Sequence, residues 1–405
     1  MMRSNSLVAT VLLCCALTTA AIAQSTDRAA TLDGDIVTGV ITAISKEGSV
    51  TVNDAAGTDS ARQIDLMRLR HIERGQASTN PNKPTLLIYQ IHGGIIRAES
   101  IVVADQKMVI DWVYGKGLTL PLSAVRGVLL TPPDGWPKTP LDESFQASLQ
   151  SPSPQHDRLY VATEKNVQSL DGLLQSLDDQ EARVLWENQV RPIARGKLYG
   201  VVFAKGAATS DPTGLCRLTM KDGSIIWGKV DQMADGELSL TLTPDCQVTL
   251  PWNEVMRLDV RSDRMMFLSD LNPVEVTQEA IVTFNWPWRR DAGVLGQTMQ
   301  LGGKTYDKGL GVHARNLLTF ENNGFDRLVA VIGLQPQVKG KGDCEFVVLG
   351  DGAELFRQRM RGSDDPKSVN VKVRGVKRVT LAVEPGEDLD LADDANWADA
   401  RFIKD

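Results

Sequence analysis

The stretch from Cys216 to Val260, CRLTMKDGSIIWGKVDQMADGELSLTLTPDCQVTLPWNEVMRLDV, decides the fold class of most of the chain. It begins with an alternating segment around Leu218 and Met220, and Asp222-Gly223 then gives a strong β-hairpin signal. Further short alternating segments follow, and the unit closes on QVTLPW and VMRLDV. Five short strands separated by turn residues predict a small curled sheet or barrel.

The same outline occurs three more times upstream, which indicates an internal repeat. Gly39 and Gly172 occupy the place of Gly228, where a bent strand leaves little room for a side chain. The predicted units are residues 30–75, 84–131, 157–204 and 214–261. We therefore predict four tandem small β-barrels, which resemble SH3-like or Sm-like barrels. That resemblance implies a scaffold or interaction role, with protein partners bound through the repeats.

One segment of this region fits two kinds of secondary structure. Residues 167–187, VQSLDGLLQSLDDQEARVLWE, also fit helical periodicity, but their register with the other units favours strands.

The joins between units are rich in Pro, Gly, Ser, Thr and Asn, which is typical of linkers. Residues 132–156 form the longest of these predicted linkers.

The character of the sequence changes in residues 263–405. Val369, Val371 and Val373 alternate with polar residues, and Gly350-Asp351-Gly352 marks a hairpin between two apolar segments. Seven or more short strands with even turn spacing predict a β-sandwich. The fold class expected for the whole chain is therefore all-β.

Several blocks of this region, in order, carry a family resemblance. They are SDLNPVEV, WPWR, LGGKTYDKGLGVHA, GKGDCEFVVLGDGAELF, GVKRVTLAVEPGED and NWADARF. Residues 263–405 thereby resemble the NPCBM domain, a carbohydrate-binding module associated with glycoside hydrolase family 98 and related to carbohydrate-binding module family 51. The resemblance implies a galactose-binding-like jelly-roll sandwich that binds a glycan or polysaccharide.

The chain departs from the family pattern in two places. Gln335-Pro336 stands where the family usually has acidic residues, and Asp393-Asp394 stands where it often has Asp-His. The sequence therefore leaves open whether the sugar site is intact.

A sugar site combines a flat aromatic face with fixed polar groups. The candidates are Trp286, Trp288, Arg289, Asp307, Lys308, His313, Trp397 and Asp399. Trp288 and Trp397 are the favoured platforms if a tryptophan is exposed, and core packing is the alternative for each. His313 has a buried, hydrogen-bonded role as its alternative, and Asp307 and Lys308 could instead fix a turn.

The acidic segment near the C-terminus is a calcium candidate, because Ca²⁺ takes six to eight oxygen ligands. The residues concerned are Asp388, Asp390, Asp393 and Asp394. A solvated acidic loop is the alternative, and we expect no other cofactor.

Catalytic motifs are missing from the sequence: it contains no G-x-S-x-G or HExxH pattern and no phosphate-binding glycine loop. After the repeats and the sandwich, no segment remains for a catalytic barrel of about 250 residues. We therefore predict a non-catalytic protein. Two alternatives stay open: a protein-interaction module that no longer binds sugar, and a glycoside hydrolase.

The first 23 residues have a positive residue, an apolar run and an Ala-Ile-Ala ending, which predict a signal peptide and export to the periplasm, cell surface or medium. No later apolar run is long enough to span a membrane. The net charge of −7 argues against a nucleic-acid partner. Cys216 and Cys246 could form a disulfide or remain small buried residues.

Overall fold

The computed structural model describes residues 26–54, 61–75, 86–130, 139–162, 167–204, 214–282, 284–338 and 340–405. Within these ranges, regular structure is almost entirely β, with a single α-helix, α1 (Thr139–Gln150). This confirms the all-β prediction. None of the helices in these ranges has the length and apolar character needed to cross a membrane. The predicted signal peptide, residues 1–23, lies outside the described residues.

Four repeats share one order of five strands, with a 3₁₀ turn between the fourth and the fifth. Repeat 1 contains β1 (Asp27–Thr31), β2 (Ile36–Ile44), β3 (Ser49–Asn53), β4 (Arg62–Asp65) and β5 (Leu69–Glu73). Repeat 2 contains β6 (Leu86–Gln90), β7 (Ile95–Ala104), β8 (Lys107–Trp112), β9 (Gly115–Pro121) and β10 (Val125–Leu129). Repeat 3 contains β11 (Asp157–Ala162), β12 (Val167–Leu177), β13 (Glu181–Trp186), β14 (Gln189–Ala194) and β15 (Leu198–Val202). Repeat 4 contains β16 (Cys216–Met220), β17 (Ile225–Ala234), β18 (Glu237–Thr243), β19 (Cys246–Pro251) and β20 (Val255–Val260).

In every repeat the first strand pairs with both the second and the fifth, and the second, third and fourth follow as hairpins. Residues 167–187 are strands, as the register of the repeats predicted. The likeness of these units to SH3 or Sm barrels, and their division into separate domains, remain predictions.

The predicted bend glycines lie where backbone packs closely. Gly39, Gly172 and Gly228 sit at one matched position of the second strand, opposite the first residue of the first strand. A Cβ at Gly39 would lie 2.4 Å from the Asn53 carbonyl oxygen, so a side chain there would force the strands apart. Repeat 2 has Ala98 at this position.

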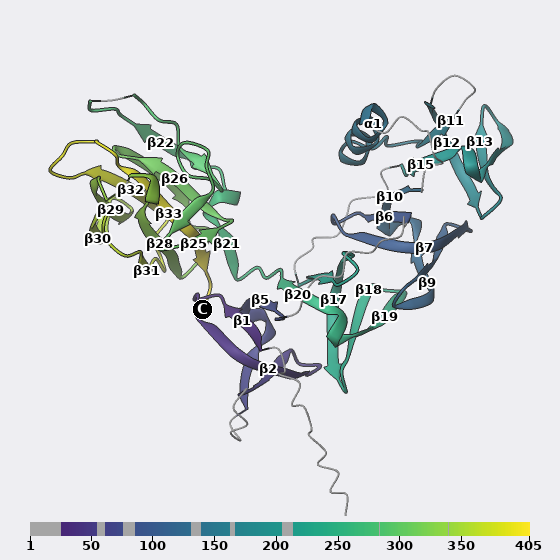
Figure 1. Ribbon diagram of the computed structural model, residues 1–405, viewed down its shortest axis with the longest axis horizontal. Helices are drawn as coiled ribbons and strands as arrows, with labels where there is room; N and C mark the ends of the chain where they lie inside the picture. Colours follow the sequence, from purple (N-terminus) through teal and green to yellow (C-terminus); the bar gives the residue numbers. More distant parts are fainter. Residues whose placement is uncertain are drawn as a thin grey trace, which may run out of the picture.

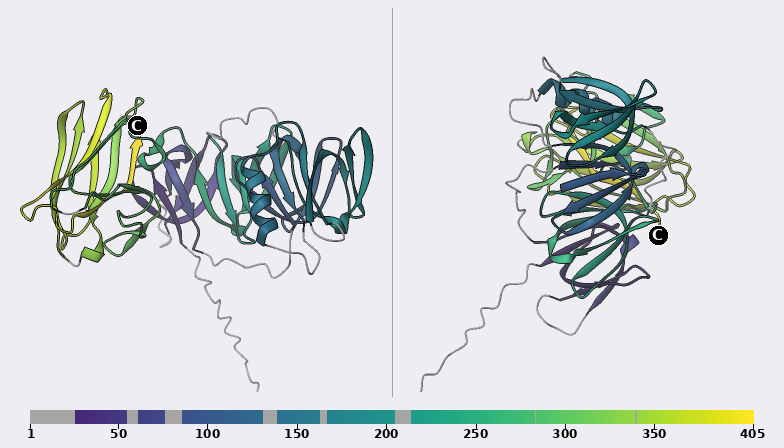
Figure 2. Two further views of the ribbon diagram at one scale, coloured as in Figure 1. Left: turned by 90° about the horizontal axis from the view of Figure 1, so that it is seen from above. Right: turned by 90° about the vertical axis from the view of Figure 1, so that its right-hand side faces the viewer.

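The repeats pair in a nested order. The fifth strands β5 and β20 join repeats 1 and 4, and β10 and β15 join repeats 2 and 3. The two pairs then meet where Ile225 of β17 faces Ile95 of β7. The resulting row runs repeat 3, repeat 2, repeat 4, repeat 1 (Figures 1 and 2). One continuous apolar core extends through all four repeats.

Helix α1 lies inside residues 132–156, which the sequence predicted to be a linker. Phe145 of this helix is fully buried, and its ring lies 5.5 Å from that of Tyr160 and 6.1 Å from that of Tyr199. Proline- and serine-rich flanks dominate the segment, so the short amphipathic helix between them was missed. The helix covers the outer face where β10 and β15 pair.

The C-terminal sandwich consists of two main sheets. One has the order β23 (Arg289–Arg290), β26 (Gly309–His313), β33 (Asp394–Ile403), β28 (Arg327–Leu334), β31 (Lys367–Lys372), with β21 (Met265–Phe267) also paired to β33. The other has the order β22 (Glu275–Gln278), β27 (Asn316–Glu321), β32 (Arg378–Pro385), β29 (Asp343–Gly350), β30 (Ala353–Arg361). A short hairpin, β24 (Met299–Leu301) with β25 (Lys304–Tyr306), completes the domain. An apolar core fills the space between the sheets, as expected for a sandwich.

The sandwich is held against repeat 1 at one end of the row (Figure 2). Arg401 is 1% exposed, and its Nε and Nη2 groups both donate to the Leu32 carbonyl oxygen, at 2.9 and 2.8 Å. Arg70 donates to both carboxylate oxygens of Asp399, at 2.6 and 2.7 Å. A guanidinium with fixed, bidentate partners gives a directional contact, so the two domains meet in one defined orientation.

Cys216 and Cys246 are buried free thiols, as is Cys344. The disulfide alternative is therefore wrong, and the reading as small buried residues holds. Burial raises the pKa of the Cys216 thiol to about 12, so this group is unreactive.

Candidate functional site

The most exposed aromatic group of the sandwich lies in the segment after β22. Phe284 is 80% exposed, and its ring centroid lies 6.5 Å from that of Trp286. The Trp286 ring in turn lies 6.5 Å from the imidazole of His313. We call Phe284, Trp286 and His313 the aromatic edge. A shallow hollow beside it, too small to enclose a water molecule, is referred to below as the pocket; it is also lined by Gln278, Glu279, Ala280, Asn285, Ala314 and Arg315.

Buried polar groups hold the segment that carries this edge. The Gln278 side-chain amide donates to the Trp286 carbonyl oxygen at 2.7 Å. Asp390, which is fully buried, accepts hydrogen bonds from the backbone N–H groups of Ile281 and Val282. Burial raises the pKa of Asp390, but these hydrogen bonds outweigh it, so the net pKa is lowered and the carboxylate is ionised. These hydrogen bonds fix the backbone of the segment that carries Phe284 and Trp286 before any ligand binds.

His313 ends β26 at the base of the pocket and is 7% exposed. Its Nδ1 lies 2.7 Å from the Ala314 carbonyl oxygen, which can only accept, so Nδ1 carries the hydrogen. The Nε2 atom lies 3.9 Å from Asp394 Oδ1. Burial raises the pKa of Asp394, and the nearby His313 partly opposes this. The buried role foreseen for His313 is correct, and the residue also borders the pocket.

A charged group forms the outer rim of the pocket. Arg315 lies 3.2 Å from Glu279 and 3.5 Å from Glu384, and half of its side chain is exposed. Because Arg315 and Glu279 line the same hollow as Trp286, they can donate to and accept from hydroxyl groups of a ligand. Flat aromatic and planar polar side chains thus meet at one place.

Of the two favoured aromatic platforms, Trp397 is buried and Trp288 is half-buried. Trp397 is 1% exposed because it points into the core between the sheets, where its ring packs edge-on against Phe346 of β29 at 5.0 Å. Trp288 packs against the core and is covered by Arg290, whose guanidinium lies 5.1 Å from the ring centroid. Arg289 is exposed and donates from Nε to the Val294 carbonyl oxygen.

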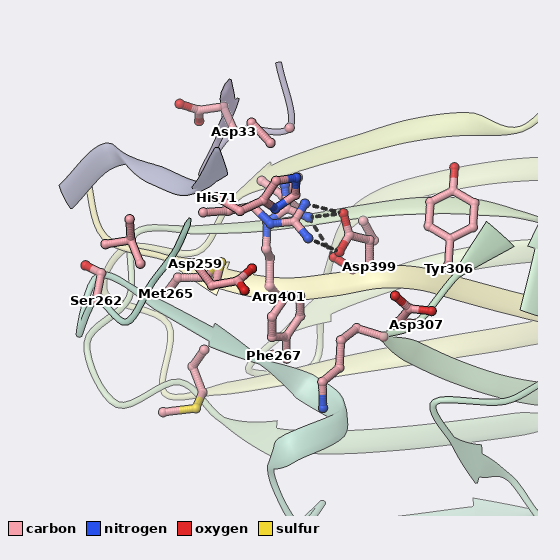
Figure 3. A pocket seen from close by; sticks show the side chains of 18 of the residues that line it. Asp33, His71, Asp259, Ser262, Met265, Phe267, Tyr306, Asp307, Asp399 and Arg401 are labelled. Carbon is pink, nitrogen blue, oxygen red and sulfur yellow. Dashed lines mark hydrogen bonds and ion pairs between the residues drawn. The ribbon is translucent and has the colours of Figure 1, made fainter. Parts of the chain in front are cut away.

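Three further predicted residues lie in a different place, a cleft of about 1790 Å³ between the sandwich and repeats 1 and 4 (Figure 3). Lys308 bonds to Asp270 and Asp291, at 2.6 and 3.0 Å. Burial opposes the charge of Lys308, but these bonds outweigh it and raise its pKa. Asp399 is occupied by Arg70 and Arg401, and Asp307 is exposed at the cleft surface. These three residues therefore do not join the aromatic edge.

The predicted calcium ligands do not form one cluster. Asp390 holds the segment below the aromatic edge, and Asp394 faces His313. Among the described residues, no three His, Cys, Asp or Glu side chains form a group that could hold a metal ion. Asp388 and Asp393 each retain one buried carboxylate oxygen without a hydrogen-bond partner in the described part of the chain. Burial, followed by the charges of Asp388 and other carboxylates, raises the pKa of Asp393 to about 7.

Gln335, one of the departures from the family pattern, is an internal residue. It is 1% exposed, and its backbone N–H donates to the Asp394 carbonyl oxygen at 2.9 Å. Its side chain accepts from the Gln300 N–H at 3.4 Å and donates to the Thr298 carbonyl oxygen at 3.5 Å, so it contacts the β24 hairpin and does not line the pocket.

Residues 264–403 match the NPCBM/NEW2 domain family. The C-terminal sandwich is an NPCBM/NEW2 domain. This identifies the region as a binding module rather than a catalytic domain.

One curated relative of the chain is a Renibacterium salmoninarum protein, named as a candidate endo-alpha-N-acetylgalactosaminidase. It is 35% identical over 114 residues, which cover 27% of this chain and 7% of that protein. The chain thus spans only a small part of its relative.

Solved structures with some likeness are modules named CBM51. The second such module of Clostridium perfringens ZmpB, in complex with GlcNAc and with INT domains, is 24% identical, with a TM-score of 0.33, and the match covers 42% of this chain and 39% of that one. The module of Clostridium perfringens GH95 in complex with methyl-galactose is 25% identical, with a TM-score of 0.31, covering 34% and 99%. Tandem modules of the Streptococcus pneumoniae family 98 glycoside hydrolase are 13% identical, with a TM-score of 0.31, covering 90% and 88%.

Sequence reasoning identified Trp286 and His313 but missed Phe284, Glu279 and Arg315. The signal available was the aromatic-rich segment FNWPW, residues 284–288, which has no strand alternation. An apolar side chain that no strand pattern places inside is a candidate for ligand contact.

Proposed function

We propose that the NPCBM/NEW2 domain binds a carbohydrate at the aromatic edge and that the repeats act as its scaffold. The observation that supports this most is the exposed ring of Phe284 next to the half-buried ring of Trp286, beside fixed polar groups. Because the Phe284 side chain is 80% exposed, its burial contributes little to folding and its ring is accessible to a ligand.

Each part of the edge has a role in this proposal. The Trp286 ring stacks on the C–H face of a pyranose, and Phe284 covers the same sugar from the side. Arg315 donates to ring hydroxyl groups and Glu279 accepts from them. His313 presents Nε2, which can accept a hydroxyl hydrogen, since Nδ1 donates to the backbone.

A glycan array followed by calorimetry on the full chain tests this function. Methyl-galactose and GlcNAc are suitable first probes for calorimetry. Trp286→Ala should weaken binding about tenfold or more, because one stacked ring is lost. Trp186→Ala is the matched control, since Trp186 is a partly exposed tryptophan of repeat 3 covered by Arg191 at 4.2 Å.

The outcomes separate the rival functions. Failure to bind any glycan at millimolar concentration would favour the protein-interaction alternative. Release of reducing sugar from a polysaccharide by the purified chain would instead favour a glycoside hydrolase. Equal affinity in Trp286→Ala and in the unmodified chain would move the site away from the aromatic edge.

We also propose that the protein is exported through residues 1–23. An exposed glycan-binding edge is useful on the side of the membrane where glycans are displayed. Expression in a bacterial host and mass measurement of the product test this: loss of the first 23 residues supports export, and retention argues against it.

A calcium ion at Asp388 and Asp393 remains a proposal. It is supported by the two buried carboxylate oxygens that lack a hydrogen-bond partner in the described part of the chain, since Ca²⁺ binds carboxylate oxygens. Calcium should raise the thermal midpoint of the full chain and chelation should lower it. Asp393→Asn should remove this dependence, and an equal response in both proteins would overturn the site.

A further inference from the structure

Each repeat pair has an outer face formed by its two fifth strands, and this face is covered in one pair and open in the other. In the pair of repeats 2 and 3, helix α1 lies on the face formed by β10 and β15. In the pair of repeats 1 and 4, the matching face of β5 and β20 is the floor of the cleft below the sandwich (Figure 3). A surface covered by a helix in one pair is therefore left open in the other.

The residues of these faces correspond one to one, counted from the 3₁₀ turn before each fifth strand. The covered face has Gly127, Leu129, Gly200 and Val202. The open face has His71, Glu73, Arg257 and Asp259 at the same positions. A Cβ at Gly200 would lie 2.7 Å from the Phe145 ring, so the glycines make room for the helix. The charged residues of the open face cannot accept an apolar helix in the same way.

The charges of the open face hold one another in place. Arg257 pairs with Glu73 and also donates to Asp259 at 2.7 Å, and Arg217 lies 3.3 Å from Asp259. Trp227 is the next residue across the sheet from Arg217 and lines the same cleft. Planar groups fixed in this way provide hydrogen bonds without much loss of side-chain entropy on binding.

The opposite wall belongs to the NPCBM/NEW2 domain. Tyr306 lines the cleft there, and Lys304 lies 4.9 Å from its ring centroid. Figure 3 shows Tyr306 and Asp307 around the same pocket as His71 and Asp259. Aromatic rings thus stand on both walls, separated by polar and charged groups.

The overall charge of the lining excludes strongly ionic ligands. Nine Arg and Lys side chains and eight Asp and Glu side chains line the cleft. Because the two signs nearly balance, neither a polyanion nor a polycation gains net attraction. A neutral ligand with many hydroxyl groups fits this chemistry, since its hydroxyl groups can donate hydrogen bonds to the carboxylates and accept them from the Arg and Lys side chains of the cleft.

We propose that this cleft is a second carbohydrate site, which takes several residues of a neutral oligosaccharide between Trp227 and Tyr306. The proposal rests on the proposed function only for the class of ligand. The site is separate from the aromatic edge and needs both the repeats and the sandwich.

The test uses full-length protein carrying Trp286→Ala, so that the aromatic edge does not contribute. Neutral tetrasaccharides of galactose, glucose and GlcNAc are titrated by calorimetry, with the three monosaccharides alongside. At least one tetrasaccharide should bind, and adding Trp227→Ala should weaken it about tenfold. Tyr306→Ala, on the opposite wall, should weaken the same tetrasaccharide, and Trp186→Ala should not. Circular dichroism verifies that each variant is folded.

Several results would overturn the cleft site. One is that no tetrasaccharide binds at millimolar concentration. Another is that Trp227→Ala and Tyr306→Ala leave the affinity unchanged. Displacement of the bound tetrasaccharide by heparin would contradict a neutral ligand, and displacement by a peptide of residues 139–150 would identify a helix-binding face instead. Loss of monosaccharide binding in Trp286→Ala alone concerns only the aromatic edge.

Discussion

Repeats 2 and 3 form a pair with the same strand register as repeats 1 and 4, yet the two pairs have opposite surface chemistry. In the pair of repeats 2 and 3, small and apolar residues allow α1 to pack on the sheet, and the face is buried. In the pair of repeats 1 and 4, charged residues leave the face solvent-accessible, and it lines a cleft. A few positions on a repeated sheet thus decide whether the same surface is buried or available for binding.

Removing the centre of the covered face should have the largest effect. Phe145→Ala is expected to lower the free energy of unfolding of the array by about 3–5 kcal/mol, because it leaves a cavity between α1 and the sheet. Urea unfolding followed by circular dichroism measures this. Val190→Ala, an exposed residue of β14, is the control and should change stability by less than about 0.5 kcal/mol. A loss below 1 kcal/mol for Phe145→Ala would show that α1 is not part of the core.

The second-largest loss of stability is expected at the contact between repeat 1 and the sandwich. Arg401→Leu removes two hydrogen bonds to Leu32 and leaves Asp399 with one cation fewer, so we expect a loss of about 3 kcal/mol. Hydrogen exchange should rise in the turn between β1 and β2, where Leu32 and Asp33 contact the sandwich. Exposed Arg378→Leu serves as the control, and unchanged exchange in Arg401→Leu would contradict a junction held by this group.

His71 should give the open pair a pH dependence that the covered pair, with Gly127 in its place, cannot have. Burial, followed by the charges of Arg257 and Arg70, lowers the pKa of His71 from 6.5 to about 4. Between these values the unfolded chain binds a proton that the folded chain does not, so stability falls as the pH decreases from 6.5 towards 4.

The expected loss from this group is about 2 kcal/mol after allowance for solvent screening. Unfolding measured from neutral to acid pH for the unmodified chain and for His71→Gln isolates it, since other groups contribute equally to both. Parallel pH curves for the two proteins would mean that His71 titrates normally.

The smallest expected change in stability comes from removing one charge of the open face. Glu73→Gln should cost less than about 1 kcal/mol, because its pair with Arg257 is partly exposed. The matched change Leu129→Gln places an amide under α1 and should cost about 1–3 kcal/mol. Similar costs for both substitutions would break the contrast between the faces.

The sequence predicted the strands of the repeats because turn residues and alternation are local signals. Residues 167–187 show the strength of this approach, since register between copies outweighed a helical pattern. Helix α1 was missed because its stability comes from Phe145 packing on distant strands. The pairing of β5 with β20 and of β10 with β15 could not be predicted either, because no local sequence signal specifies which fifth strands will pair.

The site was predicted in part for the same reason. Trp286 and His313 stood out by residue type, but the exposure of a tryptophan in a strand depends on which face of the sheet it occupies. Trp397 points between the two sheets and packs on Phe346, whereas Trp286 lies outside the strands and is half-buried. Asp307 and Asp399 belong to a cleft that exists only after repeat 1 and the sandwich come together.

The nested pairing also sets an order of assembly during synthesis. Repeats 2 and 3 can pair as soon as residue 202 has emerged, because their joining strands β10 and β15 are close in sequence. Repeat 1 is made first, but its partner strand β20 ends at Val260, and its contact with β33 ends at Ile403. Closing such long loops is slow. The first repeat to leave the ribosome is therefore the last to reach its final neighbours, and its unpaired β5 edge is the segment that a chaperone would need to protect.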